Sequence, residues 1–188
     1  MGLLEQRGVP EVWRRSIAEA LAVIDLLDER ITPIDQELGP LARADARVVL
    51  LDTIPGVGEL LGLTIASEIG DVARFGSPRK LIGYAGLAPK INQSGDRSRT
   101  GALSKAGSRT LRWAAVEAAH HAWRPSNPWH PLYSDIAARA GKNPAKSAVA
   151  RKVLIAAWHV LSRQQPFKPA APRRPHPASA SSRCFLAA

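Results

Sequence analysis

Apolar side chains recur at helical spacing along the first part of the chain. Between Val12 and Leu41 they follow one another in steps of three or four residues: Ile17, Leu21, Ile24, Leu27, Ile31, Ile34, Leu38 and Leu41. This period predicts an amphipathic helix with a seam like that of a coiled coil. Such a seam is covered either by the chain's own domain or by a second copy.

Prolines interrupt this apolar pattern at two places. Pro33 and the Gly39-Pro40 pair both fall within it. Proline removes a backbone donor and its ring collides with the preceding helical turn. We therefore expect a kink or a break, and two helices instead of one rod.

A pair of shorter helices is predicted next, joined by a turn rich in glycine. A helix from Ala44 to Thr53 precedes Ile54-Pro55-Gly56-Val57-Gly58, and a second apolar helix ends at Gly70. This arrangement resembles a helix-hairpin-helix motif, in which Gly56 and Gly58 would bring backbone N–H groups close to a phosphate. A plain tight turn between packed helices is the alternative, and Glu59 places a negative charge where a phosphate would lie.

The remaining pattern completes an all-α prediction. Ser77 and Pro78 have the residue types of a helix start, and Ser108 is expected to cap the helix that follows it. Helices are predicted at 78–84, 108–123, 131–140 and 145–163, separated by proline and glycine. The predicted organisation is coiled-coil-like linking helices at 1–43, a helical domain with the helix-hairpin-helix at 44–165, and a disordered tail rich in Pro, Ala and Ser at 166–188.

Charge is segregated along the chain, whose formal net charge is +10. Residues up to Asp71 include 6 Lys/Arg and 13 Asp/Glu, whereas residues from Val72 onward include 20 and 3. A basic half of this kind predicts a polyanionic partner and an affinity that falls steeply with salt. Solubility alone is the alternative explanation.

The apolar runs and the cysteine content indicate where in the cell the protein is located. There is no charged-then-apolar leader at Met1 and no apolar run of about 20 residues. The single cysteine, Cys184, excludes an internal disulfide and a cysteine metal site. We expect a cytoplasmic, nucleoid-associated protein without membrane contact.

Serines and cations are concentrated in NQSGDRSRTGALSKAGSRTLR, residues 92 to 112. A serine hydroxyl is a poor nucleophile, so it needs cations that hold the attacked phosphate and stabilise the transition state. Ser94, Ser98 and Ser104 are candidate nucleophiles, and a basic run can also serve only to position phosphates. The cations available for either role are Arg97, Arg99, Lys105, Arg109 and Arg112.

Five motifs in register carry a family resemblance. They are IPGVG, EIGD, YAGLAPK, SGDRSRTGALSKAGSRTLR and AVARKVL. In this order and spacing, residues 10 to 168 resemble the C-terminal domain of the IS110 family of insertion-sequence transposases, some of which are guided by a bridge RNA. The resemblance implies a serine nucleophile that forms a covalent phosphoserine link with DNA. The matching serine here is Ser94, which precedes Gly95.

The same resemblance also implies an acidic, metal-binding domain of RNase H-like fold that precedes this one. The chain starts about where the family's linking helix would start, so we expect that domain to be missing. Asp25, Asp28, Glu29 and Asp35 form no convincing metal cluster. We therefore expect no metal or cofactor in this chain, and Mg²⁺ only together with the missing N-terminal domain.

Two functions of different class remain open. The chain is either the DNA-binding and serine half of a transposase, which cleaves and rejoins DNA strands, or an inactive truncated remnant or non-enzymatic nucleic-acid-binding module. The expected partners are DNA, a guide RNA as in some family members, and either a second copy through the N-terminal helices or a full-length transposase.

Overall fold

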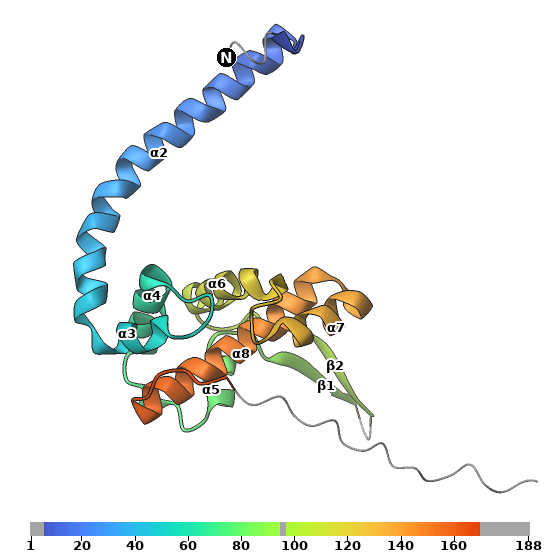
Figure 1. Ribbon diagram of the computed structural model, residues 1–188. Helices are drawn as coiled ribbons and strands as arrows, with labels where there is room; N and C mark the ends of the chain where they lie inside the picture. Colours follow the sequence, from blue (N-terminus) through green and yellow to red (C-terminus); the bar gives the residue numbers. More distant parts are fainter. Residues whose placement is uncertain (1–5, 95–96, 170–188) are drawn as a thin grey trace, which may run out of the picture.

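The computed structural model describes residues 6–94 and 97–169, with the side chains of residues 91–100 and 102 excepted. The all-α prediction is confirmed: within the described ranges, one antiparallel strand pair accompanies a helical framework (Figure 1). The predicted tail lies almost wholly outside these ranges. The elements in chain order are α2 (Glu11–Ala44), α3 (Ala46–Asp52), α4 (Glu59–Ile69), η1 (Val72–Arg74), α5 (Pro78–Tyr84), β1 (Pro89–Ser94), β2 (Arg97–Leu103), α6 (Arg109–Ala118), η2 (Ala119–Trp123), α7 (His130–Ala140) and α8 (Lys142–Arg163).

The N-terminal segment forms one helix, so the expectation of two helices was wrong. Helix α2 runs through both Pro33 and Pro40. Each proline removes a single intrahelical hydrogen bond, and the bonds on either side keep the helix continuous. Figure 1 shows α2 bending over its second half, which contains both prolines, and then reaching the helical body. Bending therefore accommodates the prolines without breaking the helix.

The apolar seam of α2 is exposed to solvent. Most of its large side chains between Leu21 and Leu41 are about half exposed, for example Leu27 at 52% and Ile31 at 48%, whereas Leu38 is half-buried and Ala42 is buried. Helix α2 contacts the body through α3 and α4 at its C-terminal end. From Leu21 to Ile34 no other described part of the chain covers the seam, in contrast to the alternative in which the chain covers it itself.

Helix α8 is the centre of the core. It contacts α3, α5, α6 and α7 (Figure 1). Val149, Val153 and Leu154 are fully buried along it. On α6, the facing positions are mostly alanine, such as Ala114 and Ala115, which are also fully buried. These small side chains let the two helices approach closely.

Side-chain hydrogen bonds fix how α3 and α4 meet. Asp45 caps α3 by accepting from the backbone N–H of Arg47 at 2.8 Å. The Arg47 side chain also donates to the Asp45 carboxylate, and this bond lowers the pKa of that carboxyl. Nη1 of Arg47 donates in addition to the Gly70 carbonyl at 3.2 Å. The start of α3 is thereby tied to the end of α4.

Candidate nucleic-acid interface

The stretch that holds the candidate serine is a β-hairpin and not a loop. Strands β1 and β2 pair antiparallel and are joined through residues 95 and 96. Ser94 is the register partner of Arg97, and Asn92 is the partner of Arg99. Figure 1 shows the hairpin extending away from the helices. Ser94 and Arg97 therefore lie at its tip, whereas Gly95 lies outside the described residues.

Backbone hydrogen bonds fix the base of the hairpin to the end of α5. The N–H groups of Ser104, Lys105 and Ser108 donate to the carbonyls of Ala88, Gly86 and Tyr84, at 2.8, 3.0 and 2.8 Å. Gly107 has φ of 126°, and a Cβ there would lie 2.1 Å from the Tyr84 carbonyl oxygen. Only glycine allows the two segments to lie this close, so the base is rigidly placed.

Arg112 stabilises the same base from α6. Its Nη1 donates to the Ala85 carbonyl at 3.0 Å and to the Lys105 carbonyl at 3.2 Å. The guanidinium therefore bridges the two segments that flank the hairpin. This contact explains an arginine here even without nucleic acid, although Arg112 had been predicted as a phosphate ligand from its charge alone.

Ser108 has a structural role, as predicted. Its Oγ accepts from the backbone N–H of Leu111 at 3.0 Å and so caps α6. The same hydroxyl donates to Oε2 of Glu68 on α4 at 2.8 Å. This Ser108–Glu68 link has no signal in the sequence, because the two residues are 40 positions apart. It links α4 to the N-terminus of α6, next to the base of the hairpin.

The five predicted cations fall into two groups. Arg97 and Arg99 belong to β2 near the tip, while Lys105, Arg109 and Arg112 lie at the base. From Pro89 to Ser94 the strand spans about 17 Å at 3.3 Å per residue. The structure thus does not gather all five cations around Ser94. At the base, Lys105 and Arg109 are exposed, and Lys105 has a left-handed backbone with φ of 53°.

The two glycines of the predicted helix-hairpin-helix have different surroundings. Gly56 has φ of 89°, and a Cβ there would lie 2.2 Å from the carbonyl oxygen of Ala118 at the end of α6. Gly58 is exposed, has φ of −107° and would place a Cβ in open space. Gly56 thus permits close packing, whereas Gly58 leaves the start of α4 accessible.

An ion pair lies beside that accessible helix start. Nη1 of Arg43 donates to both carboxylate oxygens of Glu59, at 3.1 and 3.0 Å, and both side chains are exposed. The negative charge that weakened the phosphate interpretation is therefore offset by a cation from α2. The role of Gly58 toward a phosphate stays a prediction.

The described residues contain neither a metal-binding cluster nor a membrane-spanning helix. The described part of the chain holds no group of three or more His, Cys, Asp or Glu side chains placed to bind a metal ion. Within the same ranges, no helix combines the length and apolarity needed to cross a membrane.

Comparison with known proteins shows which class of protein this chain resembles, namely the transposases of insertion sequences. Residues 48–134, from α3 into α7, match the model described as "Transposase IS116/IS110/IS902 family". The transposase for insertion sequence element IS1111A of Coxiella burnetii is 29% identical over 145 residues, which are 75% of this chain. These matches support the IS116/IS110/IS902 transposase family for this chain, as its motifs had indicated.

Two further relatives extend the comparison. A probable family 20 transposase of Pseudomonas aeruginosa is 25% identical over 169 residues, 88% of this chain. The pilin gene-inverting protein of Moraxella bovis is 29% identical over 146 residues, 74% of this chain. The chain spans 40%, 50% and 45% of the lengths of the Coxiella, Pseudomonas and Moraxella proteins.

Proposed function

We propose that this chain is the DNA-binding and serine-nucleophile part of a transposase that cleaves and rejoins DNA strands. The observation that carries the proposal is the hairpin, which holds Ser94 and Arg97 as paired residues at its tip on a rigid base. Transposition by insertion elements and inversion of a gene, the activities named for the relatives, both rearrange DNA. Both therefore need strands to be cut and joined again.

The proposed chemistry is a phosphoryl transfer to serine. The Ser94 hydroxyl gives up its proton and its oxygen forms a bond to phosphorus while the bond from phosphorus to the leaving deoxyribose oxygen breaks. The electron pair stays on that oxygen, which takes up a proton to become a hydroxyl. Cations near the tip stabilise the charge that develops on the phosphate oxygens. The acidic domain that the family resemblance implies would hold Mg²⁺, which assists charge neutralisation and proton transfer.

A non-enzymatic binding module or an inactive remnant is the second candidate function. The separation between Ser94 and the basal cations Lys105, Arg109 and Arg112 favours it. In that case the basic surface would hold nucleic acid through phosphates alone.

DNA binding is expected to depend strongly on salt. If about four phosphates are contacted, raising salt from about 50 mM to about 200 mM lowers the affinity for duplex DNA about 100-fold. Lys105→Gln together with Arg109→Gln should reduce the slope of log affinity against log salt by about two, because two phosphate contacts are lost. Fluorescence anisotropy with a labelled duplex measures both. Tight binding at high salt would contradict this electrostatic account.

Self-association through α2 is also proposed. Ile24, Leu27, Ile31, Ile34 and Leu41 are spaced as the inner positions of heptads, and each is about half exposed. A second copy would cover these side chains in the way that coiled coils do. The same seam could receive the corresponding helix of a full-length transposase.

Replacing seam residues is expected to separate the copies. Leu27→Asp with Ile34→Asp should give a particle of the monomer mass, 20.2 kDa, because charges at inner positions stay buried and unpaired in a coiled coil. Ala22→Asp with Gln36→Asp adds the same charge on the outward face and should leave the assembly intact. Sedimentation velocity measures the masses. A monomeric wild-type chain at micromolar concentration would refute self-association.

A further inference from the structure

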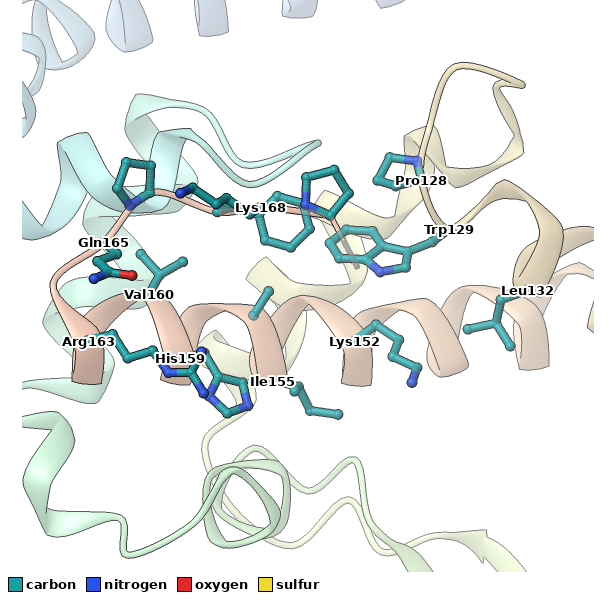
Figure 2. A pocket seen from close by; sticks show the side chains of 14 residues that line it. Pro128, Trp129, Leu132, Lys152, Ile155, His159, Val160, Arg163, Gln165 and Lys168 are labelled. Atoms are coloured by element: carbon teal, nitrogen blue, oxygen red, sulfur yellow. The ribbon is translucent and has the colours of Figure 1, made fainter. Parts of the chain in front are cut away.

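A cavity of about 540 Å³ lies along α8 (Figure 2). Lys152, Ile155, His159 and Arg163 follow one another along the helix at steps of three or four and line one side. Trp129 from the start of α7 and the segment 165–169 line the other. We call this cavity the α8 groove.

The wall opposite α8 is held in place by specific contacts. The backbone N–H of Phe167 donates to Oγ1 of Thr53 at 2.8 Å, and that of Gln165 donates to the Val160 carbonyl at 3.3 Å. The rings of Phe167 and Trp129 lie 5.6 Å apart between centroids, tilted by 51°. The groove therefore has a formed aromatic wall and not only a loose end of chain.

The charges around the groove all have one sign. Lys152, Arg163 and Lys168 line it and are exposed, and no acidic residue is among its lining residues. This charge is complementary to an anion. It disfavours the chain's own residues 170–188, which contain three arginines and no acid.

We propose that the α8 groove binds one unpaired nucleotide of a nucleic-acid strand, with the base against Trp129 and Phe167 and its phosphates on Lys152, Arg163 or Lys168. Every base has an aromatic face that can stack on such rings, and basic side chains follow the backbone beside it. A base in a duplex is buried in the stack, so only an unpaired or extruded nucleotide can enter. This inference rests on the proposed function, because it takes nucleic acid as the ligand.

The dimensions favour a nucleotide over an acidic peptide. The volume of the groove falls within the range of about 300–1,000 Å³ that is typical of small-ligand sites. The carboxylates of an acidic peptide would pair with the cations and would make no specific contact with the two aromatic rings. His159 and Gln165 add polar groups at the edge of the groove that can meet the edge of a base.

The test uses the full chain and a short single-stranded DNA that carries 2-aminopurine, with an RNA of the same sequence as a second arm. Lys152→Gln with Arg163→Gln removes two groove cations. The matched control, Arg139→Gln with Lys142→Gln, removes two exposed cations that do not line the groove. Phe167→Leu removes the aromatic ring but keeps apolar volume. Circular dichroism checks that each variant is folded.

The wild-type chain is expected to quench 2-aminopurine through ring stacking. The groove variants should bind the single strand about tenfold more weakly, in line with the loss of one stacked base or its phosphate contact. The control variant should change by less than about twofold. A difference between the DNA and RNA arms identifies which strand is the ligand.

Other outcomes would overturn the proposal. Equal losses in the groove and control variants would mean that general charge, and not the groove, attracts the strand. If the Phe167→Leu variant still quenches 2-aminopurine and binds with unchanged affinity, the base does not stack on Phe167. Preferential binding of a glutamate-rich peptide would reassign the groove to a protein partner. Duplex binding distinguishes a failure of the groove inference from a failure of the proposed function. Lys105→Gln with Arg109→Gln weakens duplex binding if the proposed function holds, whatever the groove variants do.

Discussion

Replacing Ser94 by alanine is expected to abolish the covalent DNA adduct of this chain. The alanine lacks the oxygen that would bond to phosphorus, so the covalent link cannot form at this position. Binding to duplex DNA should remain nearly unchanged, because the cations of the hairpin and its base are still present. A loss of chemistry with binding retained is the signature of a nucleophile.

The adduct is measured on denaturing gels after incubation with labelled DNA and Mg²⁺. The full-length Coxiella relative is added as the source of the acidic domain that the family resemblance implies, and the DNA carries the ends of its insertion element. This chain spans 40% of that relative, so the adducts of the two proteins differ in mobility. Ser98→Ala and Ser104→Ala serve as matched controls and should still form the adduct.

Two results would count against Ser94. An adduct that persists in the alanine variant would show that another residue attacks. An adduct on the relative alone, with none on the wild-type chain, would favour the remnant or binding-module function.

Replacing Gly56 by alanine is expected to destabilise the fold by about 3 kcal/mol or more. Its backbone has φ of 89°, and the new Cβ would lie 2.2 Å from the Ala118 carbonyl oxygen. The obstacle is backbone and not a flexible side-chain end, so the start of α4 and the end of α6 would have to move apart. Urea denaturation followed by circular dichroism measures the free energy of unfolding.

Gly58→Ala is the matched control two residues away. Gly58 has an extended backbone that any residue adopts, and its Cβ would meet open space. Its unfolding free energy should change by less than about 1 kcal/mol. If the start of α4 also binds a phosphate closely, Gly58→Ala should weaken duplex binding without unfolding. Equal destabilisation by both replacements would contradict the packing role of Gly56.

Several elements could be predicted from the sequence because their causes are local. Proline, glycine and capping residues mark helix ends, so the ends of α3, α4 and α5 and the cap formed by Ser108 agree with the pattern. The family was also recognisable, because short motifs at fixed spacing survive where overall identity is low. The continuity of α2 was missed, since a local rule about Pro33 and Pro40 ignores the many intact hydrogen bonds around them.

The hairpin was missed for a different reason. Its strands are polar on both sides and show no alternation of apolar and polar residues, which is the usual signal for a strand. Pairing is decided by the partner strand and by the base, where Tyr84, Gly86 and Ala88 accept hydrogen bonds from residues 104–108. None of these contacts can be read from neighbouring positions.

The sequence by itself determined the helical class, the charge segregation and the family, because periodicity, composition and motif spacing are properties of the chain alone. Only the tertiary structure decided that Ser94 lies at a hairpin tip, that Arg112 bridges backbone carbonyls, and that Gly56 packs against α6. Those facts depend on contacts between residues distant in sequence. Such contacts form only when the core around α8 brings the segments together.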